Sequence, residues 1–544
     1  MLYLIFLLLL LLPTATGLGA IVKWGFKSKI TGLAFQALLG LGATSVVWTA
    51  LAFFVPLGLL VEVITLLCGI TAFFYFQLYQ DFWTFLKKNP LLFASLTGIV
   101  ILLGSFYPFI LDHFGYYVPT INWLSQIGLV QGISNLDLLV AQNSFWHILQ
   151  AGFSHFADPF LRLNVVLMMI YVIYIIEKKT WIHLAFFPLF CLFLQSPSPD
   201  LPAVVVSLII LNEVFRANKN GSLLLALSVW VFAVKPTLIW VPFFLTCYNF
   251  FVLKVTFKEF LPAGIIFLLF FFKNIWTFGF PVFPVEFFDL GLSWKPNSRL
   301  LKNSGEIAIL KTYDMRYTYE EIQQFTPLDY LVKWLFLPGI KGVINIGLML
   351  ALVIFFIFSV LKKSKLVSML FAAVFVKCVL VLLFSAQYRF FFDVFFVVFF
   401  VLFSDKFNKT VPLSFLSLGT ILVLTAMSFP HLLIMLIPSF KLGNYMTGFT
   451  KTQFCTPATF SLNKFNTHQI GNLKFNVVAD GYIFSFDTPL PAMTPQYLQE
   501  NLDAGIFPQL KGESLHDGFI WRVLTPQEKD QLRHILQDLS PRNP

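Results

Sequence analysis

The stretch IKGVINIGLMLALVIFFIFSVLKKSKLVSMLFAAVFVKCVLVLLFSAQYRF, residues 340–390, is the clearest signal of the fold class. It holds two apolar runs, 340–360 and 366–384, separated by the basic turn LKKSK at 361–365. A helix needs about 20 predominantly apolar residues to cross the hydrocarbon core of a bilayer. The stretch therefore predicts two membrane helices joined by a short, positively charged loop.

The composition extends this interpretation to most of the chain. Of its 544 residues, 58% are hydrophobic and 12% are charged, whereas a soluble domain averages about 45–50% apolar and about 25% charged residues. The composition excludes an ordinary soluble enzyme and predicts an all-α polytopic membrane bundle of about 14 transmembrane helices. We expect these helices near residues 2–19, 31–54, 57–79, 91–110, 161–176, 181–195, 201–215, 222–234, 237–253, 260–272, 340–360, 366–384, 391–404 and 411–430.

The N-terminal run MLYLIFLLLLLL at 1–12 has two interpretations. A cleaved signal peptide is one of them. The run lacks a preceding basic segment, and no small-residue cleavage site stands before VKWGFKSK. We therefore interpret it as the first membrane helix.

Basic residues predict how the helices are oriented. The formal charge of +10 is divided among short clusters between the apolar runs, which favours a role in membrane topology over nucleic-acid binding. If the helices alternate as predicted, every cluster falls on one side, the side expected to be cytoplasmic. The clusters are KWGFKSK at 23–29, LKK at 86–88, EKK at 177–179, RANK at 216–219, Lys254 with Lys258, LKKSK at 361–365 and DKFNK at 405–409.

The predicted domain organisation follows from this alternation. Residues 1–437 form the bundle, and its large loops 111–160 and 273–339 lie on the outer side together with residues 438–544. This tail predicts a small α+β domain, with a hairpin around Asp480–Gly481. It also predicts two helices, one capped by Thr494 and stopped by Gly505, the other opened by a Thr525 and Glu528 capping box. The sequence shows no Gly-rich phosphate loop and no metal-spaced Cys/His set.

The first outer loop carries the first group of candidate site residues. Asp112 and His113 stand where an apolar helix ends, followed by Tyr116 and Tyr117 and later by Asn143. A carboxylate beside an apolar wall can act as a base on an acceptor hydroxyl. The alternative is an ordinary interfacial helix end without a functional role.

Asp200, in SPSPDLP at 196–202, is a second candidate acid. It would face the same outer cavity and bind a metal ion or a sugar hydroxyl. A divalent cation held by Asp112 and Asp200 is one alternative for a cofactor, which the sequence does not identify. The other interpretation of Asp200 is an acid that stabilises a helix N-terminus through the helix dipole.

Three cations break the predicted charge pattern, because Lys235, Lys273 and Arg389 all fall at outer helix ends. One interpretation is a cationic cradle for a lipid-linked phosphate, for which the bidentate guanidinium of arginine is well suited. The alternatives are ion pairs with outer-loop acids such as Glu286 or Asp289, or snorkelling towards lipid headgroups.

The order of these residues resembles the GT-C class of membrane glycosyltransferases. More narrowly, the chain is similar to an uncharacterised bacterial family of GT-C-like integral membrane proteins that is common in Bacteroidetes. The matching pieces are DHFGYYVPTINWLSQIGLVQGISNL, AQNSFW, SPSPDLP, KNIWTFGFPVFPVEFFDLGLSWKPN, QYRFF, DTPLPAMTP and LKGESLHDGF. After SNL that family usually shows His-Gly-Arg, whereas this chain has Asp137-Leu138-Leu139, so a basic outer-loop contact is missing.

The resemblance implies a glycosyltransferase of the bacterial inner (cytoplasmic) membrane that acts in cell-envelope glycan synthesis. Its donor would be a polyprenyl-phosphate-linked sugar, its acceptor a glycan or another hydroxyl compound, and Asp112 its base. Lys235, Lys273 and Arg389 would hold the lipid phosphate, while His113 and Asp200 would position the substrate. Two other functions stay open: a transporter or flippase of lipid-linked saccharides, whose charges would line a path in broken helices, and a non-catalytic envelope assembly protein.

Overall fold

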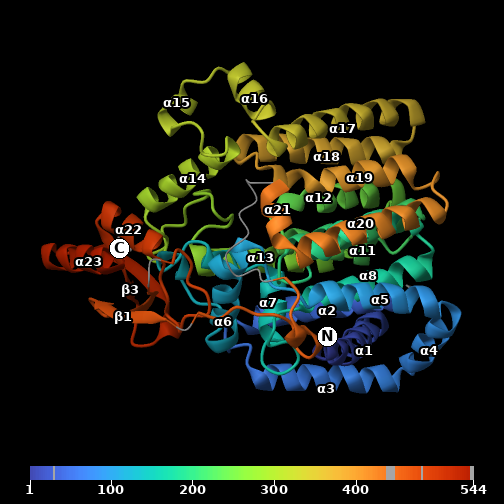
Figure 1. Cartoon of the computed structure of the whole chain (residues 1–544), viewed down its shortest axis with the longest axis horizontal. Coiled ribbons are helices and arrows are strands. Elements are labelled where there is room, and N and C mark those ends of the chain that lie inside the picture. The colour runs from blue at the N-terminus through green and yellow to red at the C-terminus, as the bar shows by residue number, and fades with distance from the viewer. Residues whose placement is uncertain (28–30, 437–447, 463, 480–481, 540–544) are drawn as a thin grey trace.

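The computed structural model describes residues 1–27, 31–436, 448–462, 464–479 and 482–539 and is mostly helical (Figure 1). The first group of helices is α1 (Leu2–Gly25), α2 (Leu33–Leu51), α3 (Leu59–Tyr75), α4 (Leu78–Lys88), α5 (Pro90–Gly104), α6 (Val118–Gln126), α7 (Phe145–Gly152), α8 (Leu163–Lys178), α9 (Phe187–Phe190), α10 (Asp200–Phe215), α11 (Gly221–Val234), α12 (Trp240–Tyr248) and α13 (Leu261–Phe278). The second group is α14 (Ser298–Thr312), α15 (Tyr319–Gln323), α16 (Pro327–Leu335), α17 (Ile340–Lys362), α18 (Lys365–Phe384), α19 (Phe392–Phe403), α20 (Thr410–Ser428) and α21 (Pro430–Leu436). The C-terminal region adds β1 (Phe465–Ile470), β2 (Leu473–Val478), α22 (Pro495–Ala504), β3 (Ile506–Leu510), β4 (Phe519–Val523) and α23 (Pro526–Leu539).

Seven helical segments of the described residues are long and apolar enough to cross a membrane, or up to eight if the bent pair α3 and α4 is one span. They are α1, α2, Pro236–Leu253, Phe257–Phe278, α17, α18 and α20. The chain thus has the helices of a multi-pass membrane protein. On its outer surface α17 exposes Val343, Leu350, Val353 and Leu361, which suits contact with lipid.

This number is lower than the predicted 14, for two physical reasons. The segment predicted as a helix at 181–195 is broken into a 3₁₀ turn, the four-residue α9 and a second 3₁₀ turn, with Pro188 near the start of α9. Other predicted spans are shorter helices: α8 has 16 residues, and residues Leu163 to Ile176 of it are buried in the protein. An apolar run that is surrounded by other helices does not need the length of a bilayer crossing.

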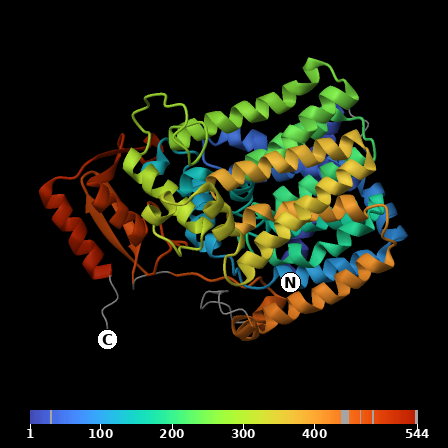
Figure 2. The same ribbon diagram turned by 90° about the horizontal axis from the view of Figure 1, so that it is seen from above.

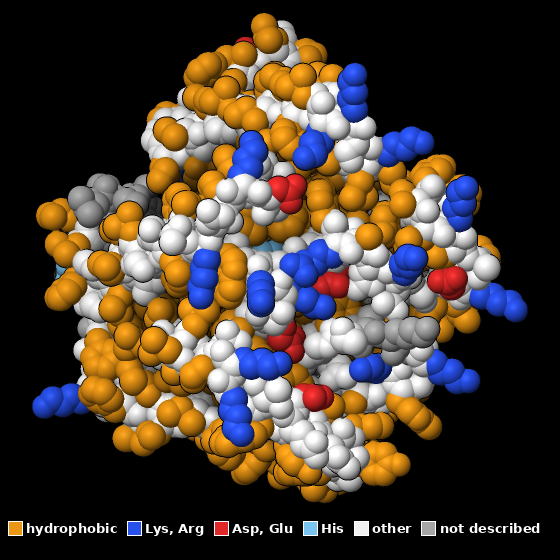
Figure 3. All heavy atoms as spheres, turned by 90° about the vertical axis from the view of Figure 1, so that its right-hand side faces the viewer, with side chains coloured by type: hydrophobic (Ala, Val, Ile, Leu, Met, Phe, Trp, Pro, Cys, Tyr) orange, Lys and Arg blue, Asp and Glu red, His pale blue; other side chains and the backbone are white. Residues whose placement is uncertain are grey.

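The basic clusters of the described residues gather at one end of the bundle, as the alternation of helices predicts, while residues 28 and 29 of the first cluster lie outside the described part of the chain. Glu177 at the end of α8 accepts hydrogen bonds from the backbone N–H groups of Leu33 and Ala34 at the start of α2, at 2.8 and 3.2 Å. Farther along, Ser222 donates to the carbonyl of Glu259, and Lys409 lies over the ring of Trp181. Figure 3 shows this face, on which Lys and Arg side chains outnumber acids. We call it the basic end.

The C-terminal region lies at the opposite end of the molecule (Figures 1 and 2). It contains two antiparallel hairpins, β1–β2 and β3–β4. In the first, Ile470 pairs with Leu473 across a two-residue turn at Gly471, which has a φ of 61°. The turn that the sequence predicts at Asp480–Gly481 lies outside the described residues. The strand before it, β2, pairs with β1 and not with residues 482–487, which form no strand.

Both helices predicted for this region are confirmed with their caps. The hydroxyl of Thr494 accepts a hydrogen bond from the N–H of Tyr497 at the start of α22, and Gly505 ends that helix at a φ of 70°. At α23, the hydroxyl of Thr525 and the carboxylate of Glu528 form the reciprocal capping box.

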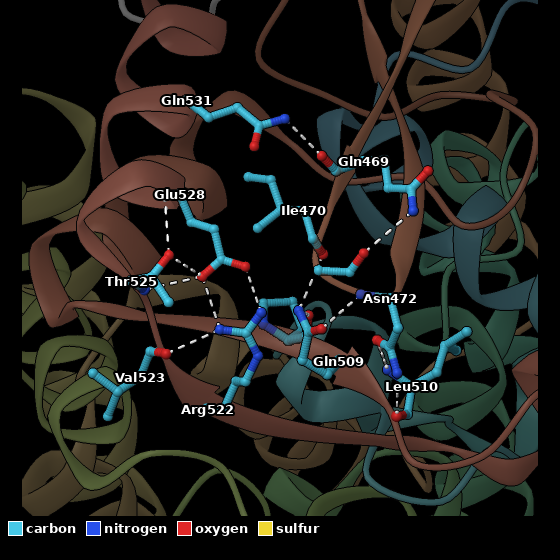
Figure 4. A network of polar contacts seen from close by, with 12 residues as sticks. Gln469, Ile470, Asn472, Gln509, Leu510, Arg522, Val523, Thr525, Glu528 and Gln531 are labelled. Carbon is cyan, nitrogen blue, oxygen red and sulfur yellow. Dashed lines mark hydrogen bonds and ion pairs between the residues drawn. The ribbon is translucent and has the colours of Figure 1, made fainter.

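A polar network ties the two hairpins and α23 together (Figure 4). The side chain of Gln509 accepts from the N–H of Asn472 at 2.9 Å and donates to the carbonyl of Ile470 at 3.1 Å. Arg522 forms an ion pair with Glu528 at the start of α23. These contacts make the C-terminal region one folded unit.

This unit docks on the loop that follows α6. The N–H of Phe519 donates to the carbonyl of Gln131 at 2.9 Å, and the hydroxyl of Tyr497 donates to the carbonyl of Ser134 at 2.9 Å. Gly132 lies at the contact with a φ of 62°, and a Cβ atom there would lie 2.4 Å from the carbonyl oxygen of Phe519. The dock therefore requires glycine at this position.

Candidate functional site

Asp112 and Arg389 meet at the end of the bundle away from the basic end. Asp112 lies after α5 and precedes a π-helical turn, η1 (His113–Tyr117), and Arg389 lies in a 3₁₀ turn, η9 (Tyr388–Phe391), between α18 and α19. Although 277 residues separate them, the guanidinium Nη1 lies 2.9 Å from the Asp112 carboxylate oxygen Oδ2. Burial opposes the charged form of Arg389, but Asp112 beside it raises the pKa of the guanidinium above its usual value.

Asp200 and Lys235 form a second ion pair close by. Asp200 is the first residue of α10, and Lys235 follows the last residue of α11. The hydroxyl of Ser198 donates to Asp200 at 3.0 Å. Asp200 and Arg389 also line a common cavity, so the four charges form one cluster at this end of the bundle.

Two cavities adjoin this cluster, and Arg389 lines both. The first, of about 320 Å³, is polar and is lined by Asp112, Lys311, Thr312, Asp314, Met315, Leu337, Lys341, Asn345, Ala386, Gln387, Tyr388 and Arg389. The second, of about 200 Å³, is mainly apolar and is lined by Leu189, Phe190, Leu192, Phe193, Asp200, Leu201, Val204, Lys235, Thr237, Leu238, Arg389, Phe390, Phe392, Asp393 and Phe396. We call them the polar cavity and the apolar cavity.

The tyrosine pair forms a wall behind the ion pairs. The rings of Tyr116 and Tyr117 lie 4.6 Å apart at 77°, and Tyr117 also contacts His147 at 4.8 Å between ring centroids. Burial is the main reason that the pKa of Tyr116 is raised, and the negative charge of Asp112 adds to it. Both hydroxyls thus stay protonated as hydrogen-bond donors.

His113 lines neither of the two cavities. It is buried, its Nδ1 lies 3.0 Å from the hydroxyl of Ser196, and burial lowers the pKa of the imidazole to about 3. At neutral pH this ring is therefore uncharged. The contact fixes the turn that presents Asp112 and does not place His113 on a cavity wall.

Lys273 and Asn143 meet each other and not the charged cluster. The ammonium group of Lys273 is fully buried and donates to the backbone carbonyls of Gln142 and Asn143, at 2.8 and 2.9 Å. Neither residue lines the two cavities. Lys273 thus satisfies the carbonyls of a tight turn in which Asn143 has a φ of 38°.

Lys235 and Arg389 pair with Asp200 and Asp112, and not with the predicted partners Glu286 or Asp289. Glu286 accepts a hydrogen bond from Ser298, and Asp289 pairs with Lys295. Asp137, the first residue of the Asp137-Leu138-Leu139 departure, is buried, and its carboxylate accepts from the N–H of Leu139 at 2.9 Å.

Two ionisable residues of the site were missed. Lys377 of α18 and Asp393 of α19 are 0% and 4% exposed at their side chains and lie 2.6 Å apart, Nζ to Oδ1. The second oxygen of Asp393 accepts from the indole N–H of Trp240 at 2.7 Å, and Lys377 also donates to the carbonyl of Phe390. Single charges inside the apolar runs 366–384 and 391–404 are the signal that could have identified them.

Lys311 and Lys341 of the polar cavity were missed as well. Both lie in or beside the large loop 273–339, where lysines are ordinary, so the sequence has no signal for them. Lys341 pairs with Asp314.

The site does not fit a divalent metal ion. Asp112 and Asp200 each face a cationic side chain, and no group of three or more His, Cys, Asp or Glu side chains in the described part of the chain could hold a metal ion.

Comparisons with known proteins place the chain in a family. No curated protein and no solved structure matches it. One family model, described as a domain of unknown function (DUF8201), matches residues 1–396, nearly three quarters of the chain. The matched segment holds every residue that lines the two cavities. The chain therefore belongs to the DUF8201 family.

Proposed function

We propose that this protein is a membrane glycosyltransferase that uses a polyprenyl-phosphate-linked sugar as its donor, in the synthesis of a cell-envelope glycan. The observation that carries the proposal is that Arg389 lines a polar and an apolar cavity at once. A sugar phosphate on a polyprenyl chain has this division, because a charged and hydroxylated head is joined to a hydrocarbon tail.

The phosphate of the donor would lie at Arg389. The ion pair with Asp112 uses one N–H group of the guanidinium, and the other donors of its planar fork remain available to phosphate oxygens. Lys235 lies on the wall of the apolar cavity near the same point. The first isoprene units would lie among Phe190, Phe193 and Phe396.

Asp112 would act as the base. It lines the polar cavity, where the acceptor hydroxyl would enter. The hydroxyl oxygen attacks the anomeric carbon of the sugar, its proton passes to Asp112, and the bond from the anomeric carbon to the phosphate oxygen breaks. The polyprenyl phosphate leaves with the bonding electron pair, and Arg389 and Lys235 stabilise its added negative charge.

A transfer assay in membranes tests this proposal. Membranes that contain the protein receive a radiolabelled polyprenyl-phosphate sugar, and both labelled glycan and released polyprenyl phosphate are measured. Asp112→Asn should lower transfer by about 100-fold or more, the usual contribution of a general base. The matched control is Asp530→Asn, which removes an exposed acid paired with Arg533 on α23 and should leave transfer unchanged.

Full transfer by Asp112→Asn would remove Asp112 from the mechanism. Labelled lipid that crosses the bilayer without loss of its sugar would favour the rival function, a transporter or flippase of lipid-linked saccharides. A wild-type protein that does neither would favour a non-catalytic role in envelope assembly.

A further inference from the structure

The short helix α4 lies at the edge of the basic end, and the chain turns sharply to enter it (Figure 1). Its axis is bent by 73° from that of α3, and the bend follows Gln77, which has a φ of 55°. The 17 residues of α3 are about 26 Å long, close to the hydrocarbon thickness of about 30 Å. Since α3 alone nearly crosses the hydrocarbon core, the bend directs α4 along the membrane surface.

The surface of α4 is divided into three strips. Leu78 and Phe85 are buried against the bundle. Tyr79, Trp83 and Lys87 follow at intervals of four residues and so form a second strip along the helix. In this strip Trp83 is 61% exposed, and the Nζ atom of Lys87 lies 5.2 Å from the centroid of its ring. The third strip is polar and exposed and consists of Gln80, Asp81, Thr84 and Lys88. This division is typical of a helix at a membrane surface, where aromatic rings lie at the level of the headgroups and polar residues face water.

The end of α1 lies beside the start of α4. Ala20 of α1, Phe73 of α3 and Leu78 of α4 form one buried cluster. Beyond this cluster α1 exposes Trp24 at 73% and is followed by Phe26, which is 53% exposed. The two segments 23–27 and 78–88 thus present aromatic rings on the same part of the surface.

Positive charge accompanies these rings. The two segments contain four lysines and one acid, Asp81, which gives a net charge of +3. The lysines are Lys23, Lys27, Lys87 and Lys88. In the described part of the chain, no carboxylate lies within salt-bridge distance of any of them. Their ammonium groups are therefore available to an anionic ligand.

We infer that segments 23–27 and 78–88 form a binding site for anionic phospholipids of the membrane surface at the basic end. The rings of Trp24 and Trp83 lie among the headgroups, and the lysines contact the lipid phosphates. Charge complementarity favours an anionic over a zwitterionic lipid, because each lysine near a negatively charged surface strengthens binding. The site lies at the end of the bundle opposite to the two cavities and does not depend on the proposed function.

Quenching of Trp83 by brominated lipids tests the inference. The full-length protein is placed in nanodiscs of phosphatidylcholine with a minor share of phosphatidylglycerol, and one of the two lipids carries bromine on its chains. The signal of Trp83 is the difference between each protein and its Trp83→Phe counterpart. At equal mole fraction, brominated phosphatidylglycerol should quench this signal more strongly than brominated phosphatidylcholine.

A triple variant removes the charges of the site. Lys27→Gln, Lys87→Gln and Lys88→Gln together should lower the preference for phosphatidylglycerol by about 10-fold or more, because each lysine near an anionic surface contributes a factor of about 5. All three side chains are exposed, so the variant keeps the fold.

The matched control removes three lysines from the turn between α17 and α18, which lies at the same end but on the other side of the bundle from α4 (Figure 1). Its substitutions are Lys362→Gln, Lys363→Gln and Lys365→Gln, and it should keep the preference of the wild type.

Three outcomes would overturn the inference. Equal quenching of wild-type Trp83 by the two lipids would remove the preference for an anionic headgroup. An equal loss in both triple variants would assign that preference to the charge of the whole basic end and not to this site. Inorganic phosphate that displaces phosphatidylglycerol at equal concentration would show that the site binds a free anion and not a lipid.

Discussion

Removal of Lys377 should destabilise the protein far more than removal of an exposed lysine. The pair of Lys377 and Asp393 is buried, with side chains 0% and 4% exposed and a distance of 2.6 Å between Nζ and Oδ1. Lys377→Met leaves the carboxylate of Asp393 buried, with the indole N–H of Trp240 as its other partner. Breaking a buried pair from one side costs about 3–5 kcal/mol, whereas loss of an exposed pair costs about 0.2–1 kcal/mol.

The assay is unfolding by an SDS titration in mixed micelles, followed by tryptophan fluorescence. The matched control is Lys302→Met, whose partner Glu306 lies 4.0 Å away on the surface of α14. The double variant Lys377→Met with Asp393→Asn should recover most of the lost stability, because an asparagine is neutral and can still accept from Trp240. The reasoning is refuted if Lys377→Met unfolds at the same SDS fraction as Lys302→Met, or if the double variant is no more stable than the single one.

Three further predictions concern residues outside the cavities. Gly132→Ala should weaken the contact between the C-terminal region and the loop after α6, because the added Cβ would lie 2.4 Å from the carbonyl oxygen of Phe519. Limited proteolysis should therefore release the C-terminal region faster than in the control Gly98→Ala, where the added Cβ meets no atom within 4 Å. Burial raises the pKa of Asp137 from 3.8 to about 6, so the folded protein loses stability as the pH rises through this window. At pH 8 the free energy of unfolding of Asp137→Asn should therefore exceed that of the wild type by at most about 3 kcal/mol. The two proteins should be equally stable near pH 4, and a constant difference across this range would contradict the assignment. Lys273→Met should lower the free energy of unfolding by about 1–3 kcal/mol for each carbonyl that loses its partner, and should leave the affinity for polyprenyl monophosphate unchanged. A loss of affinity without a loss of stability would show that Lys273 belongs to the binding site.

Local chemistry made part of the fold predictable. Each cap of α22 and α23 joins residues three positions apart, so Thr494 and Thr525 indicate the helix starts in the sequence. The gathering of basic clusters at one end was also predictable, because it depends on the alternation of helices and not on their packing. The number of spans was not, because an apolar run such as α8 has the same composition whether lipid or protein surrounds it.

The candidate site was predictable only as a set of unusual residues. Asp112, Asp200, Lys235 and Arg389 stand out as charges at the ends of apolar runs, and the structure brings these four together. Lys273 has the same sequence signature, but it lies at a different place, because a buried ammonium group can be satisfied by backbone carbonyls as well as by an anion.

The sequence alone predicts a multi-helix membrane protein whose positive charges collect at one end, followed by a small α+β region. The packing of the helices sets which acid meets which cation, and it gives Arg389 a place in the lining of two cavities. The two kinds of feature differ in the range of the interactions on which they depend. Caps and apolar runs depend on neighbours within a few residues, whereas the contact of Asp112 with Arg389 joins groups 277 residues apart and exists only after the helices between them have packed.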